Sequence, residues 1–428
     1  MLSRGIIRMQ SSAATKLGPV IARNTLIILG AILLGETTIN YIDRQVVSVL
    51  APTLKGEFGW NNAQYALILN AFLFTYAVAY SFAGWVLDRL GIRRGLTLAI
   101  LWWSVAGALT SFSRGLKSMA AFRSILAVGE AGAWPSFAKA AATWVPVEAR
   151  ALFIGACNSG SSLGALIAPS IVGGLTYYYG WRAAFLVTGV IGFLWVIVFQ
   201  IFMRRHPELS HTDQTVKLPR RSWIQLLGYR ETWAVFICRF LADPLWYFYL
   251  FWIPSFLDQE RGLNLAGIAL VAGIPYVAAD LANFVSGYVS LRLQRRGWSI
   301  NRTRKALMIL AACVSPIGIL AVYAHTLFWT IALISVAIFF WMFWSVTVHT
   351  LAGDYFPSQE VGSVYGIAGT GSTVGTAIST WGVGHVLDIT HSYAPVFIGI
   401  SVLMPIALIV GLSVMGRVVP VSLKAAQS

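Results

Sequence analysis

The stretch GACNSGSSLG, residues 155–164, is followed 211 residues later by the similar stretch GIAGTGSTVG, residues 366–375. Three glycines of the first string each match a glycine of the second at this one offset, and Pro146 matches Pro357 at the same offset. Small residues let any two membrane helices pack closely, but four matches at one offset favour an internal repeat. Parallel repeats of this kind occur in transporters that span the membrane twelve times. The chain is therefore predicted to consist of two similar halves.

The composition around these strings is that of a membrane protein. Apolar residues make up 57% and charged residues 11% of the 428 residues, against about 45–50% and about 25% in soluble domains. The net charge of +15 would suit nucleic-acid binding, but the Lys and Arg residues cluster in short loops between apolar runs of about 20 residues. This is the positive-inside pattern of a membrane protein, which argues against a nucleic-acid-binding protein and against a soluble enzyme.

Twelve apolar segments are long enough to cross a bilayer as helices. They are predicted at residues 24–50, 62–87, 95–112, 116–144, 150–177, 182–203, 232–257, 266–291, 304–324, 327–354, 361–388 and 393–416. The first six and the last six each form a predicted bundle. The predicted domains are an N-terminal segment (1–23), an N-terminal bundle (24–203), a linker (204–231), a C-terminal bundle (232–416) and a tail (417–428).

The distribution of Lys and Arg predicts the orientation. With the N-terminus placed in the cytoplasm, the cytoplasmic loops and ends carry 22 of these residues and the opposite loops carry five. Because positively charged loops stay on the cytoplasmic side, both termini are predicted to be cytoplasmic. The first apolar run is longer than that of a signal peptide and lacks a small-residue cleavage site, so it is predicted to be a retained span. The cysteines, Cys157, Cys238 and Cys313, lie inside apolar runs and predict no disulfide framework.

Two predicted spans of the first half carry ionisable residues, which are costly in hydrocarbon and therefore functional candidates. Asp43 and Arg44 lie in the first span, and Arg123 and Glu130 lie seven residues apart on one side of the fourth. Arginine binds a carboxylate through two parallel hydrogen bonds. A buried carboxyl group can exchange a proton when its surroundings change, because burial favours the neutral form and a nearby cation favours the carboxylate. Together these groups supply what the symport of an organic anion with protons requires.

Other charged groups in the predicted spans have alternative interpretations. Arg239 and Asp243 stand at i, i+4 and are interpreted as a structural ion pair. Glu36 either faces the cleft between helices or takes part in function, and the role of Asp280 stays open.

The stretch GWVLDRLGIRR, residues 84–94, resembles the signature of the major facilitator superfamily between its second and third helices. The predicted signature residues are Gly84, Asp88, Arg89, Gly91 and Arg93. A glycine allows close helix approach, and the basic residues suit the inner membrane surface. The alternative is a generic positive-inside loop. The corresponding stretch of the second half, GYVSLRLQRRG at residues 287–297, lacks the aspartate.

More extended strings resemble the anion:cation symporter family of that superfamily. These are NYIDR at residues 40–44, R-x6-E at residues 123–130 and GEAGAWP at residues 129–135. The stretch FLADPLWYFYLFWIPSFL, residues 240–257, is most similar to the bacterial hexuronate branch. The resemblance implies an all-α integral membrane fold, with twelve transmembrane helices in two pseudo-symmetric six-helix bundles and cytoplasmic termini. It implies no cofactor and no metal.

The resemblance also implies roles for individual residues. Asp43 and Glu130 resemble the proton-responsive carboxylates of the family, and Arg123 resembles a buried arginine that balances them. Arg44 matches the position that contacts the substrate carboxylate. The other predicted substrate-binding residues are Tyr41, Tyr76, Asn158, Ser161 and His349. His349 and Gly369 stand where sugar-acid relatives carry a tryptophan and an asparagine, so the sugar-hydroxyl contacts and the exact substrate stay open.

The predicted function is import of a hexuronate (glucuronate or galacturonate) or a related sugar acid by proton symport across a bacterial inner membrane. The expected partners are a small organic anion, protons and the lipid bilayer, with no nucleic acid. One alternative is a proton symporter for another organic anion, such as an aldonate, an aldarate or an aromatic carboxylate. A second is a proton-coupled exporter, which would not need Arg44. A membrane enzyme is disfavoured, because the sequence has no HExxH or CxxC motif.

Overall fold

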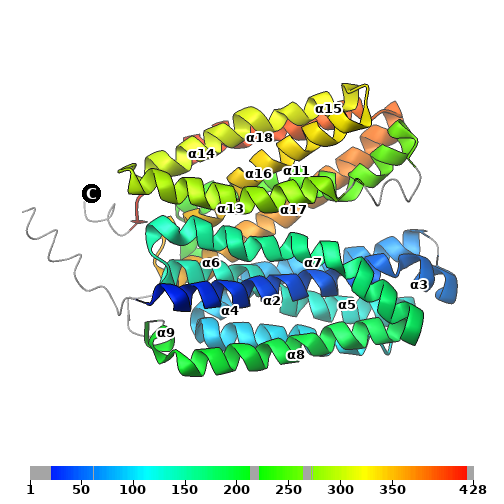
Figure 1. Ribbon diagram of the computed structural model, residues 1–428, viewed down its shortest axis with the longest axis horizontal. Helices are drawn as coiled ribbons and strands as arrows, with labels where there is room; N and C mark the ends of the chain where they lie inside the picture. Colours follow the sequence, from blue (N-terminus) through cyan, green and yellow to red (C-terminus); the bar gives the residue numbers. More distant parts are fainter. Residues whose placement is uncertain (1–20, 61, 213–220, 264–270, 272, 422–428) are drawn as a thin grey trace, which may run out of the picture.

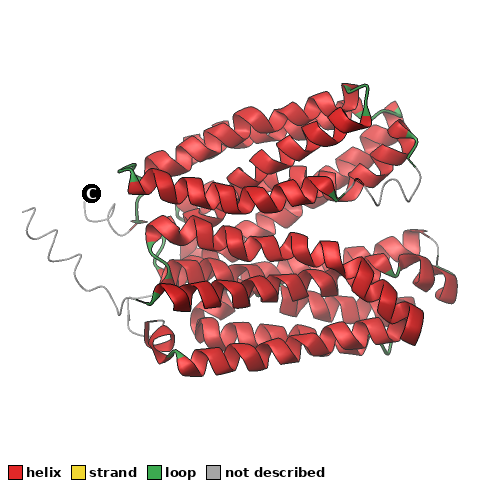
Figure 2. Cartoon of the chain, in the orientation of Figure 1, coloured by secondary structure: helices red, strands yellow, loops and turns green. Residues whose placement is uncertain are grey.

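The computed structural model describes residues 21–60, 62–212, 221–263, 271 and 273–421, and all regular structure in these residues is helical (Figure 2). The helices run in the order α2 (Arg23–Val49), α3 (Ala51–Phe58), α4 (Asn62–Thr110), α5 (Leu116–Glu130), α6 (Ala133–Trp144), η1 (Val147–Ala149), α7 (Arg150–Tyr179), α8 (Trp181–Arg205), α9 (Pro207–Thr212), α10 (Trp223–Leu226), α11 (Arg230–Arg261), α13 (Ile274–Arg295), α14 (Ile300–Val314), η2 (Ser315–Ile319), α15 (Leu320–Tyr323), α16 (Leu327–Tyr355), α17 (Ser358–Thr390) and α18 (Ala394–Met415). Most of the predicted N-terminal segment and tail, the middle of the linker and the start of the eighth predicted span lie outside the described residues.

The outer surface of these helices is apolar. Side chains that are more than half exposed include Ile27, Phe74, Leu98, Ile197 and Ile409. Soluble monomers rarely expose large contiguous apolar patches. In lipid, by contrast, an apolar surface is favourable and a helix satisfies its own backbone hydrogen bonds. The exposed apolar side chains therefore mark the lipid-facing surface.

Within the described residues, eight helical segments are long and apolar enough to cross a membrane. They are Arg23–Val49, Leu67–Thr110, Val147–Tyr179, Trp181–Arg205, Arg230–Ile253, Ile300–Tyr323, Leu327–Tyr355 and Ala394–Met415. Two predicted spans share the long segment in α4, and three others fall in α5 with α6, in α13 and in α17. The count of twelve spans therefore stays a prediction.

Helix α4 corrects one expectation, because the sequence predicted two spans, at residues 62–87 and 95–112, separated by a loop. Instead, helical geometry continues on both sides of Gly91, which alone has non-helical torsion angles, with φ 76° and ψ 164°. Glycine adopts a positive φ without steric strain, so one residue is enough to turn the chain. The two arms then pack closely, and a Cβ on Gly95 would lie 2.6 Å from a methyl carbon of Leu87.

Two other predicted spans are interrupted. The fourth is divided into α5 and α6 at Ala131 and Gly132. The ninth continues from α14 into the 3-10 turn η2 and the short helix α15. Pro316 lies in that turn, where its missing N–H removes one hydrogen bond of a regular α-helix.

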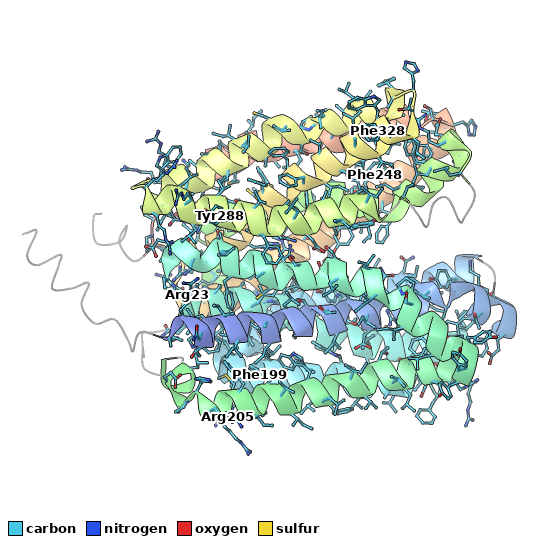
Figure 3. The ribbon with its side chains drawn as sticks, viewed as in Figure 1. Arg23, Phe199, Arg205, Phe248, Tyr288 and Phe328 are labelled. Carbon is cyan, nitrogen blue, oxygen red and sulfur yellow. The ribbon has the colours of Figure 1, made fainter. Side chains whose placement is uncertain are left out.

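The helices form two groups, which we call the N-terminal bundle (α2–α8) and the C-terminal bundle (α11–α18) (Figure 1). Helix α4 meets α17 and α7 meets α13 across the boundary between them. The ribbons of the two bundles approach each other at the left of the view and diverge at the right. We name these the Arg23 end and the Phe328 end after residues labelled in Figure 3.

The repeated glycines have equivalent roles inside the two bundles. A Cβ on Gly164 of α7 would press on the backbone carbonyl of Thr38 on α2, and one on Gly375 of α17 would collide with the carbonyl of Phe240 on α11. Each repeat helix thus packs backbone to backbone against the first long helix of its own bundle.

The same helices also cross between the bundles. A Cβ on Gly155 of α7 would collide with the carbonyl oxygen of Asn283 on α13, and one on Gly366 of α17 would lie 2.6 Å from the carbonyl oxygen of Tyr80 on α4. The two halves therefore meet through two equivalent glycine crossings, one between α7 and α13 and one between α4 and α17.

Candidate functional site

Arg44 on α2 and Glu130 at the end of α5 form an ion pair. The Nε and Nη2 atoms of Arg44 lie 3.0 and 2.9 Å from the same oxygen, Glu130 Oε2. Glu130 is fully buried, whereas the Arg44 side chain keeps 20% of its surface exposed. Among the described residues, Glu130 Oε1 meets no hydrogen-bond partner. One carboxylate oxygen thus makes both contacts and the other is left for a proton or a new donor.

Aromatic rings surround the Arg44 guanidinium. Its Cζ atom lies 4.7 Å from the ring centroid of Tyr76, 5.2 Å from that of Tyr41 and 5.3 Å from that of Phe72. Contacts of this kind stabilise a cation by about 0.5–2 kcal/mol each. The planar guanidinium group of arginine can stack on aromatic rings and bind a carboxylate through two hydrogen bonds, whereas the ammonium group of lysine is a point charge that does neither in this way. The surroundings are therefore built for an arginine.

Arg123 contacts backbone rather than a carboxylate. Its Nη1 and Nη2 atoms donate to the carbonyl oxygens of Asp43 and Arg44, each at 3.2 Å. The side chain is only 2% exposed, and its charge acts on Glu130 and Asp43 through space. Arg123 thus fixes this turn of α2 to α5. Its predicted role in balancing the two acids stays a prediction.

Asp43 precedes Arg44 on α2 and is 3% exposed. Its carboxylate is beside Thr188 of α8, but neither oxygen makes a hydrogen bond of good geometry to a residue that the structure describes. An isolated buried charge is expensive. The charge state of Asp43 therefore depends strongly on what its neighbours carry.

A cavity lies between the two bundles. Its wall includes five of the six predicted substrate-binding residues, Tyr41, Tyr76, Asn158, Ser161 and His349. The sixth, Arg44, is not part of the wall and reaches it through its contacts with the rings of Tyr41 and Tyr76. The three predicted proton-coupling residues also lie outside the wall.

Side chains join the bundles across this cavity. The Trp134 ring packs edge-on against Tyr41 of its own bundle and against His349 of the C-terminal bundle, at 6.1 Å between centroids in both cases. Asn158 Nδ2 donates to Asn283 Oδ1 at 2.9 Å. The Ser161 hydroxyl donates to the carbonyl of Asn158 at 2.7 Å, so in this arrangement its hydrogen is already engaged.

The cavity contains a charged pair that sequence reasoning interpreted only as structural. Arg239 Nε lies 3.1 Å from Asp243 Oδ2, so the predicted pair exists. The structure adds that both residues line the cavity, together with Trp246 and Tyr247 of the same helix. These four positions stand at i, i+4, i+7 and i+8, which is one face of a helix. That spacing was the sequence signal for a shared lining.

Two acids with open roles lie outside the cavity wall. Glu36 is fully buried, and neither of its oxygens meets a hydrogen-bond partner in the described part of the chain. Asn40, one turn later, is equally buried and unpaired within the same residues. Asp280 on α13 lies beside Ser162 and Asn283. Glu36 therefore belongs to the interior of the N-terminal bundle, and Asp280 lies close to the α7–α13 crossing.

The signature aspartate joins the two bundles nearer the Arg23 end. Asp88 of α4 accepts hydrogen bonds from the backbone N–H groups of Gly362 (3.1 Å) and Ser363 (2.6 Å) and from the Ser363 hydroxyl (2.7 Å) on α17. Lys139 of α6 donates to Asp88 at 3.0 Å. Hydrogen bonds to a charged acceptor are among the strong ones. Asp88 therefore closes the boundary between the bundles on this side of the cavity.

Of the other signature residues, Gly84 contributes to this closure, while Arg89 and Arg93 make contacts within the N-terminal bundle. A Cβ on Gly84 would collide with the carbonyl oxygen of Gly362, so only glycine lets α4 and α17 approach this closely. Arg89 stacks on the ring of Trp85, with 3.9 Å between its Cζ atom and the centroid. Arg93 Nε donates to Gln200 Oε1 at 2.9 Å and so fastens α4 to α8.

A second polar contact seals the same side. Arg150, at the start of α7, donates from Nη1 to the carbonyl of Gly353 on α16 at 2.7 Å. The carboxylate of Asp354 lies 3.8 Å from Arg150 and 2.8 Å from Arg304. Side chains of both bundles thus interlock here, which fits the approach of the ribbons at the Arg23 end.

Comparison with known proteins places this arrangement in a family. The sequence profile of the Major Facilitator Superfamily matches residues 34–380. The chain belongs to the Major Facilitator Superfamily.

Relatives within the superfamily match over most of their length. A protein named hexuronate transporter from Escherichia coli (strain K12) is 30% identical over 387 residues, covering 86% of this chain and 88% of the relative. A protein named probable sulfoacetate transporter SauU from Cupriavidus necator is 28% identical over 384 residues, covering 83% of this chain and 86% of the relative. The resemblance to hexuronate transporters seen in the sequence strings is thus confirmed.

A solved superfamily structure has the same fold. The proton:xylose symporter XylE, bound to 6-bromo-6-deoxy-D-glucose, aligns with a TM-score of 0.75 and covers 92% of this chain and 97% of its own. At 14% identity, this likeness concerns the fold alone.

Membership of the superfamily establishes the class of the protein. It is a helical membrane transporter and not an enzyme, as the sequence predicted. Among the described residues, no group of three or more His, Cys, Asp or Glu side chains could hold a metal ion.

Proposed function

We propose that this protein is a secondary transporter that imports a hexuronate, or a related sugar acid, together with protons across a bacterial inner membrane. The similarity to the hexuronate transporter of Escherichia coli supports the substrate class. The observation that carries the proposal is the Arg44–Glu130 pair at the edge of the cavity. In this pair Arg44 can exchange the carboxylate of Glu130 for the carboxylate of a substrate.

The proposed topology has twelve spans with both termini in the cytoplasm. Described basic residues at or near the ends of α2, α8 and α14 support this, since Arg23, Arg204, Arg205 and Arg302 all stand at positions that the sequence predicts to be cytoplasmic. Figure 3 shows Arg23 and Arg205 at the same end of the molecule, as the positive-inside rule requires. A reporter fused after Ser428 is expected to be active only in the cytoplasm, and activity outside would overturn the orientation.

The coupling step is a competition for Arg44. In the resting pair, Glu130 Oε2 occupies both the Nε and the Nη2 donors. A proton on Glu130 weakens its hold on the guanidinium, because the attraction between opposite charges is lost. The substrate carboxylate then binds the guanidinium group of Arg44, whose paired N–H donors suit bidentate recognition of a carboxylate.

Asp43 supplies the second proton-binding group. It lies close enough to Glu130 and Arg123 for its charge to influence both. When both acids carry protons, Arg44 and Arg123 leave the cluster positive and attractive to an anion. When the substrate leaves, Arg44 returns to a deprotonated Glu130 and resets the carrier. If more protons move than the substrate has negative charges, transport is electrogenic.

Alternating access requires the contacts of the Arg23 end to separate. The described contacts at that end join the bundles through Asp88 and Arg150. In this arrangement the carrier is therefore sealed toward the predicted cytoplasm. Substrate release to the cytoplasm requires both contacts to open while the bundles close at the Phe328 end, as in the rocking of two repeats around a fixed site.

The direct test is uptake of labelled galacturonate into proteoliposomes, with and without an acid-outside pH gradient. We expect the gradient to drive accumulation, and a protonophore that collapses the gradient to reduce uptake to equilibration. Uptake that ignores the gradient would contradict proton coupling. A lack of any uptake would contradict the hexuronate assignment and lead to a competition panel of other acids.

A second candidate is symport of a different organic anion, such as an aldonate, an aldarate or an aromatic carboxylate. The surroundings of Gly369 support this second candidate. The space beside Gly369, where sugar-acid relatives carry an asparagine, is filled by the ring of Tyr80, since a Cβ on Gly369 would collide with that ring. Position 369 therefore provides no side-chain hydrogen bond to a sugar hydroxyl.

A further inference from the structure

Helix α11 brings a second arginine–carboxylate pair to the wall of the cavity opposite the N-terminal bundle. Arg239 Nε donates to Asp243 Oδ2 at 3.1 Å, and both residues line the cavity with Ser372 and His349. The two side chains of the pair are 7% and 8% exposed. This pair has no part in the coupling step derived above.

Polar atoms around this pair lack partners within the described residues. They are Arg239 Nη1, His349 Nδ1, Tyr365 Oη and Tyr80 Oη. All four side chains are at least nine-tenths buried. The Tyr80 hydroxyl lies beside Arg239 without a hydrogen bond of good geometry. Buried polar groups are almost always hydrogen-bonded, so this set has unused hydrogen-bonding capacity next to the cavity.

The ring contacts hold these groups in one cluster. The Arg239 guanidinium lies 5.0 Å from the Tyr365 ring and 5.8 Å from the Tyr80 ring. The His349 and Tyr365 ring centroids are 5.3 Å apart. The cluster therefore spans α4, α11, α16 and α17, and its members are fixed by packing rather than by hydrogen bonds to one another.

The chemistry of the cluster suits hydroxyl groups better than a second acid group. Asp243 already balances the charge of Arg239, so the pair is neutral overall and offers an anion no net attraction. The unused atoms include a guanidinium donor, an imidazole nitrogen and phenol hydroxyls, which both donate and accept. A polyhydroxylated ring presents the same mixture of donors and acceptors.

Tyr76 and Tyr80 connect this cluster to Arg44. They are one turn apart on α4, and their ring centroids lie 5.1 Å from each other. Arg44 stacks on Tyr76, and Arg239 faces Tyr80. A ligand that lies along these two rings would reach both arginines, one at each end.

We propose that Arg239, Asp243 and His349 form the subsite that binds the hydroxyl groups of a sugar acid whose carboxylate docks at Arg44. This inference rests on the proposed sugar-acid function and names its specificity-determining residues. It also explains how the chain recognises hydroxyl groups although Gly369 offers no side chain, because Tyr80 fills that space and the recognition falls to α11.

The experiment compares two ring acids that share a carboxylate and differ in their hydroxyl groups, galacturonate and cyclohexanecarboxylate. Ligand-induced thermal stabilisation of the purified protein gives a Kd for each acid without requiring transport. The variant Arg239→Gln/Asp243→Asn puts an amide on each side chain and removes both charges together, which avoids leaving one buried charge unpaired. His349→Gln tests the subsite separately if the double variant does not fold. Asp280→Asn is the control, since this acid of the same bundle lies outside the cavity wall.

We expect the preference for galacturonate over cyclohexanecarboxylate to fall at least about tenfold in the double variant and in His349→Gln, because a site built to hydrogen-bond a hydroxyl discriminates strongly against its absence. Asp280→Asn should keep the wild-type preference, and Arg44→Lys should weaken the binding of both acids. If folded variants keep the preference within about twofold, the subsite is refuted and the sugar-acid function stands. If the wild type binds neither acid, the sugar-acid function fails and the subsite fails with it.

Discussion

Each bundle holds an arginine–carboxylate pair in or beside the cavity wall, but the pairs differ in their surroundings. In the N-terminal bundle, Arg44 and Glu130 share two helices with two further charged groups, Asp43 and Arg123. In the C-terminal bundle, Arg239 and Asp243 are neighbours on one helix and lie among tyrosine, histidine and serine side chains. One pair thus belongs to a network of charges and the other to a neutral, polar wall.

This difference assigns different tasks to the two halves. A network of acids and bases responds to a proton, because discharging one member changes the partner of another. A pair that is balanced by its immediate neighbour keeps its charge and offers fixed hydrogen-bond geometry. The N-terminal bundle is therefore expected to couple transport to protons, and the C-terminal bundle to recognise the uncharged part of the substrate. The repeat gives the two halves similar packing and leaves their polar linings free to diverge.

The largest effect is expected from Arg44→Lys, which tests whether the N-terminal pair holds the anion. Lysine lacks the planar fork that contacts the carboxylate, and truncating one side of a buried charged pair costs about 2–5 kcal/mol. The affinity for galacturonate should fall by about 30-fold or more, as measured by competition for uptake. The exposed Arg114→Lys is the matched control and should behave as the wild type. An unchanged affinity in Arg44→Lys would remove Arg44 from the substrate site.

Asp43→Asn should separate exchange from accumulation. Asparagine has the shape of a protonated aspartate and cannot release the proton. We expect the variant to exchange labelled against unlabelled galacturonate across the liposome membrane and to lose accumulation driven by a pH gradient. A variant that still concentrates substrate would show that coupling does not need this acid, and the contrast between the bundles would have to rest on Glu130 alone.

Gly84→Ala tests the closure at the Arg23 end rather than either pair. The added methyl would collide with the carbonyl of Gly362, and overpacking of this kind usually costs about 1–3 kcal/mol. The transport rate should fall by about 5- to 100-fold with little change in the Kd for galacturonate. Gly173→Ala is the control, because a Cβ at that position in α7 would meet no atom within 4 Å. If both substitutions slowed transport equally, the close approach of Gly84 and Gly362 would not be the cause of the slower transport.

The smallest effect is expected from Glu36→Gln. Glu36 is fully buried, lies outside the cavity wall and has no hydrogen-bond partner among the described residues. Glutamine keeps its shape and cannot bring a charge into the bundle interior. Gradient-driven uptake should stay within about twofold of the wild type. Loss of accumulation would instead add Glu36 to the coupling network of the N-terminal bundle.

Much of the local structure could be predicted from the sequence, because periodicity and the cost of burying charge act locally. The spacing of Arg239 and Asp243 predicted their pairing, and the repeated glycines predicted two similar halves. The single-residue turn at Gly91 was missed, since a basic string of this kind is equally compatible with a longer loop. The break between α5 and α6 was missed because the composition does not change there.

The arrangement of the site was harder to predict from the sequence. Asp43, Arg44, Arg123 and Glu130 could be grouped from their helical faces, but not assigned to partners. Only the relative placement of α2 and α5 in the fold decides that Glu130 pairs with Arg44 while Arg123 donates to backbone carbonyls. The place of Arg239 in the cavity depends on how the two bundles meet, which involves contacts between residues far apart in the chain. The sequence contains no local signal for such contacts.

The division of tasks between the bundles is tested most directly by the proton flux that accompanies the substrate. Galacturonate is added to proteoliposomes that contain a pH-sensitive dye and have no imposed gradient. Saturating galacturonate should acidify the lumen in the wild type and in Arg239→Gln/Asp243→Asn, the latter at higher substrate concentration, and should leave the pH unchanged in Asp43→Asn. Proton movement in Asp43→Asn, or its complete loss in the Arg239→Gln/Asp243→Asn variant at saturating substrate, would contradict the division of tasks between the bundles.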